Sequence, residues 1–231
     1  MTIRAVLFDI GGPIDTEAER ERYIDAQIVR ALAGAGFSVS AEQFAAANDA
    51  AVASFAPSVY GSIIWQLSGC DPDVAERAYC AFHDSLGAMP PIELRPGIRE
   101  LLAGIVGRGL MLGLAANQPS SALAALDGLG VGQFFKHREV SGIHGFRKPD
   151  VRLFLRCCDE LSVEPAECVV VGDRIDNDIV PARMLGMRSV LFRVGRHIAQ
   201  QPRSHDDVPD AEVRSVDELA RALSELIGVD V

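Results

Sequence analysis

Ala5-Val6-Leu7-Phe8-Asp9-Ile10-Gly11-Gly12 is the stretch that decides the fold. Its first four residues are apolar without alternation, which is typical of a parallel strand buried on both faces. A second apolar run, Val169-Val170-Val171-Gly172, ends at Asp173. In open α/β sheets the ligand crevice lies outside the carboxyl ends of the strands, so we expect both acids at one site. Two such carboxylates predict a site for a hard cation and an anionic substrate.

The rest of the chain predicts an α/β fold class. From Pro96 onward, helical and strand patterns alternate as in βαβ units, which favours a Rossmann-like parallel sheet with helices on both faces. Residues 17–86 show helical patterns only. We therefore expect residues 1–15 and 91–231 to form the core domain and residues 16–90 to be an inserted α-helical domain.

Composition narrows the functional classes. The chain has 231 residues, of which 48% are hydrophobic, and a formal net charge of −10. This acidic balance argues against binding to nucleic acid or to an anionic membrane surface. The sequence shows neither a signal-peptide pattern nor an apolar run that would cross a bilayer. The odd count of five cysteines, without a C-x-x-C pair, is unlike a disulfide framework, and we expect a cytoplasmic protein.

Four motifs in order carry a resemblance to a known family. They are Phe8-Asp9-Ile10-Gly11-Gly12, Ala115-Ala116-Asn117, Lys148-Pro149-Asp150, and Gly172-Asp173 followed by Asp178. In this order and spacing the chain resembles the haloacid dehalogenase-like (HAD) hydrolase superfamily over residues 3–192. The helical insert resembles the C1-type cap of its subfamily I.

The resemblance implies a role for each motif. Asp9 would be the nucleophile that forms an aspartyl-phosphate, and Lys148 would hold Asp9 and neutralise the phosphoryl group. Mg²⁺ would be held by Asp9, the Gly11 carbonyl, Asp173 and Asp178. For Asp178, an acid that simply favours a helix N-terminus is an equally good interpretation. The implied phosphate-binding residues are Gly11, Gly12, Ala116, Asn117 and Lys148.

Three positions depart from the family pattern. Gly11 stands where the phosphatases of the family usually carry a second aspartate, the general acid and base, whose contribution is typically about 10²–10⁴-fold. Ala116 replaces a Ser or Thr that would donate to the phosphate, and Pro13 replaces a Thr or Val. Phosphatase chemistry is therefore expected to be altered or weakened.

Other functions remain to be weighed. Gly11 and Ala116 favour a catalytically silent protein that binds phosphate or a partner, while Asp9, Lys148 and Asp173 favour an enzyme. A dehalogenase is disfavoured because Asp173 keeps the metal-site pattern that dehalogenases do without. A phosphonate-cleaving enzyme would need a cap lysine, and residues 17–86 contain none.

Several further side chains are candidates with a plainer alternative. Asp15 is expected to belong to the linker into the cap, although it is also a candidate replacement for the missing acid. His83 and His144 are expected to be structural or exposed. The cap aromatics are more often core than substrate contacts at helical spacing; they are Tyr60, Trp65 and Phe82. Residues 200–207 read as an exposed loop without a role.

Together these observations predict a cytoplasmic, Mg²⁺-dependent phosphatase for a small phosphorylated metabolite. It would act as a monomer or homodimer, without nucleic-acid or membrane partners.

Overall fold

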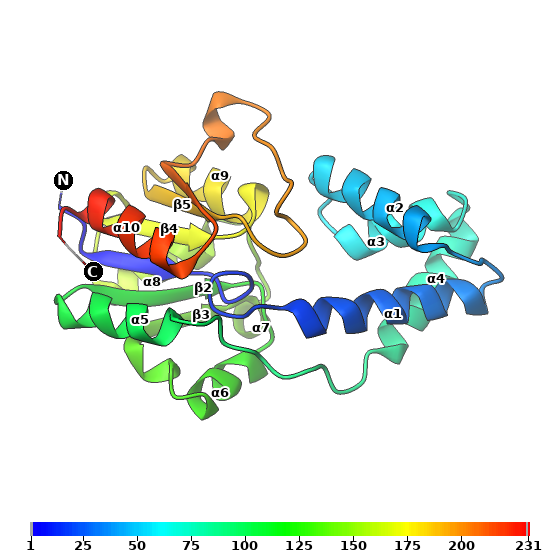
Figure 1. The fold of residues 1–231 in the computed structure, drawn as a ribbon, viewed down its shortest axis with the longest axis horizontal. Helices are drawn as coiled ribbons and strands as arrows, with labels where there is room; N and C mark the ends of the chain where they lie inside the picture. The colour runs from blue at the N-terminus through cyan, green and yellow to red at the C-terminus, as the bar shows by residue number, and fades with distance from the viewer. Residues whose placement is uncertain (1, 230) are drawn as a thin grey trace. The chain divides into compact units, whose positions relative to one another are not determined.

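The computed structural model describes residues 2–229 and 231, and the chain divides into two compact units (Figure 1). One unit contains the N-terminal segment up to Glu17 together with Ile92–Val231. The other is Ala18–Pro91, which is inserted after the first strand.

A six-stranded parallel sheet forms the centre of the first unit. Its strands are β1 (Ala5–Phe8), β2 (Met111–Ala116), β3 (Phe135–Val140), β4 (Cys168–Gly172), β5 (Arg188–Phe192) and β6 (Ala211–Val213). They lie in the order β3-β2-β1-β4-β5-β6. The strand order reverses between β1 and β4, where ligands bind in open sheets of this kind. The predicted α/β fold class is confirmed.

Strand register brings the acidic motifs together. Phe8 pairs with Leu114 of β2 on one side and with Val171 of β4 on the other. Asp9 and Asp173 therefore leave adjacent strands at the same edge of the sheet.

Helices cover both faces of this sheet. Val6 and Phe8 of β1 pack in a hydrophobic cluster with α5 (Ile98–Gly107), α6 (Ser121–Gly128) and α10 (Val216–Ile227). The alternate residues Ala5 and Leu7 pack on the other face with α8 (Arg152–Leu161) and α9 (Val180–Met184). The remaining elements are α7 (Ser141–His144), a π-helical turn (Ile175–Ile179) and 3₁₀ turns at Gly132–Phe134, Pro165–Glu167 and His205–Asp207.

The inserted unit is all helical. Its helices are α1 (Ala18–Gly34), α2 (Ala41–Ala53), α3 (Val59–Leu67) and α4 (Pro72–Ser85). Ser40, Ser58 and Asp71 cap the N-termini of α2, α3 and α4 by accepting hydrogen bonds from backbone N–H groups. Phe82 is 1% exposed and belongs to the core of this unit, whereas Trp65 is 42% exposed.

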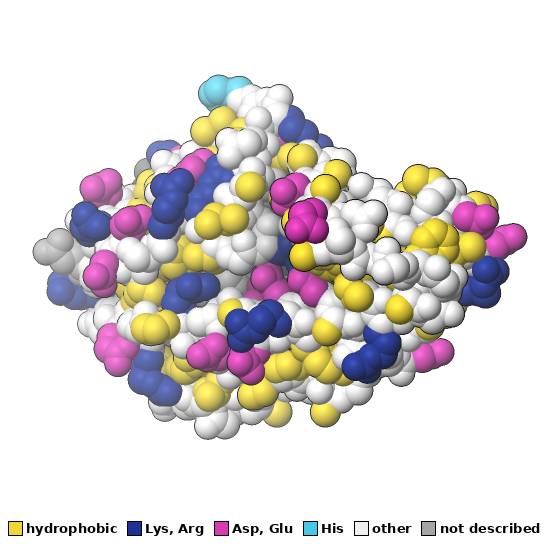
Figure 2. All heavy atoms as spheres, turned by 45° about the vertical axis from the view of Figure 1, so that its right-hand side comes forward, with side chains coloured by type: hydrophobic (Ala, Val, Ile, Leu, Met, Phe, Trp, Pro, Cys, Tyr) yellow, Lys and Arg dark blue, Asp and Glu magenta, His cyan; other side chains and the backbone are white. Residues whose placement is uncertain are grey.

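The surface agrees with the composition. On the face shown in Figure 2, acidic and basic side chains are interspersed with apolar ones. In the part of the chain that the structure describes, no helix is long and apolar enough to cross a membrane. The five cysteines are all free thiols.

Three details differ from the sequence prediction. The patterns after Pro96 indicate neither the short edge strand β6 nor the π-helical turn Ile175–Ile179 that precedes α9. The segment 200–207 is not simply exposed, because Gln200 is 1% and Asp207 is 5% exposed. Both polar side chains can be buried because backbone N–H groups donate hydrogen bonds to them. Gln200 accepts from Ile175, and Asp207 accepts from Arg203.

Candidate active site

Asp9 lies directly after β1, at the carboxyl edge of the sheet. Its backbone N–H donates to the carbonyl of Val171 at 2.9 Å, which fixes the residue against β4. Its Oδ1 accepts the N–H of Ile10 at 2.8 Å and lies 3.1 Å from Nζ of Lys148. Oδ2 has no hydrogen-bond partner among residues 2–229 and 231, and the side chain is 13% exposed. One oxygen is thus held while the other remains available to react.

Lys148 links Asp9 to Asp178. Its ammonium is 1% exposed and lies 2.5 Å from Oδ1 of Asp178 as well as 3.1 Å from Asp9. Burial disfavours the charged form, but Asp178 and Asp9 outweigh burial and raise the pKa of Lys148 above its ordinary value. Lys148 therefore stays protonated.

The backbone of Lys148 is fixed by Asn117, which follows β2. The N–H of Lys148 donates to Oδ1 of Asn117 at 2.8 Å, and Nδ2 of Asn117 donates to the Lys148 carbonyl at 2.9 Å. The second motif thus positions the lysine through its asparagine side chain. The methyl group of Ala116 packs in the hydrophobic core, so this side chain offers no group to a ligand.

Asp178 is fully buried in the π-helical turn after β4. Its Oδ2 accepts the N–H of Arg174 at 3.1 Å, while Oδ1 faces Lys148. Gly172 makes room for it, because a Cβ there would overlap the Asp178 carboxylate. Burial, with a further contribution from Asp9, raises the pKa of Asp178 to about 6 although Lys148 opposes this shift.

Asp173 is the least satisfied carboxylate of the site. It is 6% exposed, and no hydrogen bond or ion pair reaches its side chain from the described residues. Burial first, and then the charges of Glu17, Asp9 and Asp178, raise its pKa well above the ordinary value. Gly12 permits this close approach, since its φ is +77° and a Cβ there would lie 2.6 Å from Cβ of Asp173.

These acids form one cluster with the chemistry of a cation site. Ligand oxygens of Asp9, Asp173 and Asp178 all lie within 4.8 Å of one another. When ionised, three carboxylates and the Lys148 ammonium leave a formal charge of −2, which matches a divalent cation. Carboxylate oxygens are the ligands that Mg²⁺ prefers. The unsatisfied Asp173 carboxylate therefore fits a bound magnesium ion.

Gln200 belongs to a supporting network behind the cluster, and this role was not foreseen from the sequence. Oε1 of Gln200 accepts the N–H of Ile175 at 2.7 Å, and its Nε2 donates to Asp176 at 3.1 Å. Asp176 also pairs with Arg174 at 2.5 Å. These contacts fix the turn that carries Asp173 and Asp178. No local sequence signal marks Gln200, because its partners are 24 and 25 residues away.

Asp15 has a structural position. It is 2% exposed, and its Oδ1 accepts the N–H of Glu17 at 3.1 Å and that of Glu93 at 3.0 Å. The carboxylate thereby ties together the two chain segments that lead into and out of the helical unit. This agrees with the linker interpretation of Asp15.

The two candidate histidines have other partners. Nε2 of His144 lies 2.9 Å from Oε2 of Glu139, a buried residue near the carboxyl end of β3. His83 packs edge-to-face against Tyr79 within α4. Neither histidine is among the contacts of Asp9 or Lys148 that the structure records for the described residues.

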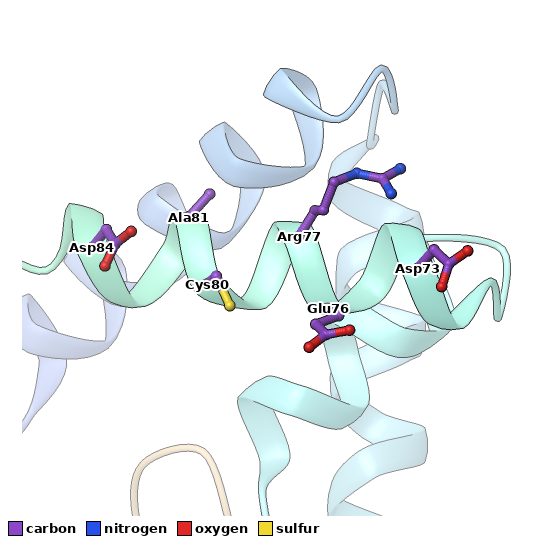
Figure 3. A pocket seen from close by; sticks show the side chains of 6 residues that line it. All are labelled: Asp73, Glu76, Arg77, Cys80, Ala81 and Asp84. Atoms are coloured by element: carbon purple, nitrogen blue, oxygen red, sulfur yellow. The ribbon is translucent and has the colours of Figure 1, made fainter.

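A hollow lies on the surface of α4 (Figure 3). Figure 3 shows its side chains distributed along the length of this one helix, and the sequence motifs contribute none of them. They are Asp73, Glu76, Arg77, Cys80, Ala81 and Asp84. This hollow shares no residue with the acidic cluster of Asp9, Asp173 and Asp178.

Comparison with known proteins agrees with the motifs. Residues 3–186 match the sequence profile of the haloacid dehalogenase-like hydrolases. A glyceraldehyde 3-phosphate phosphatase of Methanopyrus kandleri is 29% identical over 97% of this chain and 98% of its own length. A phosphoserine phosphatase of Thermus thermophilus is 34% identical over 56% of this chain and 52% of its own.

A solved structure has the same fold. The crystal structure of a HAD phosphatase from Thermococcus onnurineus superimposes with a TM-score of 0.63 and 23% sequence identity. The match covers 99% of this chain and 100% of that one.

Proposed function

The chain belongs to the haloacid dehalogenase-like hydrolase family, and on that premise we propose that it is a Mg²⁺-dependent phosphatase of small phosphorylated metabolites. One observation carries the proposal. At the carboxyl edge of the sheet, Oδ1 of Asp9 is fixed by Lys148 and by the N–H of Ile10, while Oδ2 is left to react. The phosphatase names of the two relatives support the reaction class.

The proposed reaction has two halves. Oδ2 of Asp9 attacks phosphorus, the bond from phosphorus to the ester oxygen breaks, and an aspartyl-phosphate forms. Water then attacks phosphorus, and the bond to Asp9 breaks to release inorganic phosphate and regenerate the carboxylate. A carboxylate suits this task because the mixed anhydride is itself easily hydrolysed.

Charge is the main obstacle, since a dianionic phosphate must approach an anionic nucleophile. Lys148 faces Asp9 and is held in the charged form, so it neutralises the attacking side of the reaction. Asp173, Asp9 and Asp178, together with the Gly11 carbonyl, are the proposed ligands of Mg²⁺. When bound, the ion would supply Lewis-acid stabilisation of the charge on the phosphoryl oxygens. The backbone amides around Gly12 and Asn117 are proposed to bind the phosphate.

The helical unit Ala18–Pro91 is proposed to be a C1-type cap. It is inserted between β1, which precedes the nucleophile, and the rest of the sheet. We propose that this insert selects the substrate and excludes water from the reaction. The relatives name two compounds for a substrate screen, glyceraldehyde 3-phosphate and phosphoserine.

Hydrolysis of para-nitrophenyl phosphate with and without Mg²⁺ tests the proposal. This activated ester needs little protonation of its leaving group, so formation of the aspartyl-phosphate from it depends mainly on the nucleophile and the cation. We expect Mg²⁺-dependent turnover in the wild type and none in Asp9→Asn. Asp159 is an exposed acid on α8, so Asp159→Asn is the matched control and is expected to keep wild-type turnover.

Gly11 and Ala116 favour a second candidate, a catalytically silent protein that binds phosphate or a partner. Equal background rates in the wild type and Asp9→Asn would support that candidate. Binding of inorganic phosphate, measured by calorimetry, would then be the property to test.

A further inference from the structure

Position 11 lacks the acid that the family resemblance leads us to expect there, yet a carboxylate occupies its side-chain space. A Cβ built on Gly11 would lie 2.7 Å from Oε1, 2.8 Å from Cδ and 2.9 Å from Oε2 of Glu17. All three nearest atoms belong to that one carboxylate. The glycine therefore leaves room for an acid delivered from six residues further along the chain.

The backbone brings Glu17 back to this place. Gly11 and Asp15 form an isolated parallel bridge, so the chain curls beside the nucleophile loop after leaving it. Glu17 then adopts a left-handed conformation with φ of +59°, which is uncommon for a residue with a side chain. Its N–H is held by Oδ1 of Asp15 at 3.1 Å. This turn directs a half-buried glutamate at Gly11.

The neighbouring residue also places Glu17 beside the reaction site. Gly12 follows Gly11 directly and approaches Asp173 so closely that a Cβ built on it would lie 2.6 Å from Cβ of Asp173. Burial lowers the pKa of Arg95, and the charges of Asp15, Glu17 and Asp173 oppose this shift. The Nε of Arg95 donates to the carbonyl of Gly12 at 2.7 Å. Glu17 thus lies within electrostatic range of the loop that carries the nucleophile.

We propose that Glu17 is the general acid and base of this phosphatase, in place of an aspartate at position 11. The inference rests on the proposed function and names a residue that the sequence motifs do not. It also explains why glycine is found at position 11, since any side chain there would displace the Glu17 carboxylate.

The proton balances over the two halves of the reaction. As the ester bond breaks, the protonated Glu17 carboxyl donates its proton to the leaving oxygen, which departs as an alcohol. The resulting carboxylate takes a proton from the water that attacks the aspartyl-phosphate, and Glu17 is protonated again. Ester and water are converted to alcohol and inorganic phosphate, and no further reactant is needed.

Aryl phosphates of graded leaving group test this role. Phenyl phosphate needs protonation of its leaving oxygen far more than para-nitrophenyl phosphate does. We expect Glu17→Gln to lose about 10²-fold or more in kcat/KM on phenyl phosphate and much less on para-nitrophenyl phosphate. Glu93→Gln is the matched control, because Glu93 is an exposed acid that accepts from Thr16 on the same linker. It is expected to change neither rate.

A positional exchange supplies a second test. Gly11→Ala should displace the Glu17 carboxylate and copy the leaving-group dependence of Glu17→Gln. Gly11→Asp combined with Glu17→Ala places an acid at position 11 with room to fit. We expect this double variant to recover activity on phenyl phosphate relative to Glu17→Ala alone.

The outcomes separate this inference from the proposed function. Equal losses in kcat/KM on both esters in Glu17→Gln, or no loss in kcat/KM on either, would overturn the role of Glu17 while Asp9-dependent turnover persists. Turnover that survives Asp9→Asn would instead overturn the proposed function. Thermal melting of each variant identifies any loss that is due to unfolding.

Discussion

Lys148 and Asp178, thirty residues apart, form an ion pair with 1% and 0% exposed side chains and an Nζ–Oδ1 distance of 2.5 Å. Removing one partner of a buried pair leaves an uncompensated charge, which is far costlier than losing a surface pair. The pair therefore links the stability of the core to the site, because the same ammonium holds Asp9.

Lys148→Met is accordingly expected to lower the free energy of unfolding by about 3–5 kcal/mol and to abolish turnover. Urea denaturation measures the first effect. Lys136→Met, which removes an exposed lysine of β3, is the control and should change stability by less than about 0.5 kcal/mol. Equal effects of the two substitutions would contradict the buried pair.

Gly12→Ala is expected to be destabilising by about 1–3 kcal/mol and to reduce kcat/KM. The new Cβ would need a φ of +77° and would lie 2.6 Å from Cβ of Asp173. Gly107→Ala in α5 is the matched control, since a Cβ there would meet no atom within 4 Å. That control should be neutral or slightly stabilising. A neutral Gly12→Ala would show that Asp173 does not require this approach.

Mg²⁺ is expected to raise the melting temperature of the wild type, because its proposed ligands at the acidic cluster are assembled only in the folded chain. Asp173→Asn should lose this shift, and without metal it should melt higher than the wild type because one of the crowded acids has been neutralised. Differential scanning fluorimetry over a Mg²⁺ titration measures both effects. A wild-type shift retained in Asp173→Asn would place the ion elsewhere.

His197 predicts a pH dependence of stability. Burial, followed by the charges of Arg174 and Arg196, lowers the pKa of His197 from 6.5 to about 3. As pH falls below 6.5 the unfolded chain takes up a proton on His197 that the folded chain does not, so this residue alone contributes a loss of stability of about 1.4 kcal/mol per pH unit down to about pH 3. His197→Gln should show a shallower decline over this range.

The control for His197 is His205→Gln, whose side chain is 91% exposed. It should reproduce the wild-type pH dependence of the free energy of unfolding, measured by urea denaturation between pH 4 and pH 7. Parallel curves for the wild type and His197→Gln would rule out the buried neutral imidazole.

Site residues that follow the ends of strands could be predicted from the sequence, whereas residues brought to the site by long-range packing could not. Asp9 and Asp173 were found because apolar runs mark buried parallel strands, and acids at their carboxyl ends share one edge. Gln200 was missed since its hydrogen bonds to Ile175 and Asp176 join segments that no local pattern connects. The position of Glu17 depends on a left-handed turn, which its spacing from Asp9 does not reveal.

The helix boundaries illustrate the same division. The helix α10 has a strong amphipathic pattern over Val216–Ile227, which agrees with the helical patterns expected in the part of the chain after Pro96. The turn Ile175–Ile179 is π-helical and carries Asp178, whose buried ion pair with Lys148 joins residues that no local pattern connects. The three-residue strand β6 is too short to leave an alternating pattern.

The most direct test of the account is the position of the phosphoryl group during turnover. Wild-type enzyme would be mixed with para-nitrophenyl phosphate and Mg²⁺, quenched in acid and mapped by peptide mass spectrometry. We expect a phosphorylated peptide with the modification on Asp9, enriched in Glu17→Gln because hydrolysis of the intermediate is slowed. Ester turnover without a phosphorylated Asp9, or with the phosphoryl group on another residue, would contradict it.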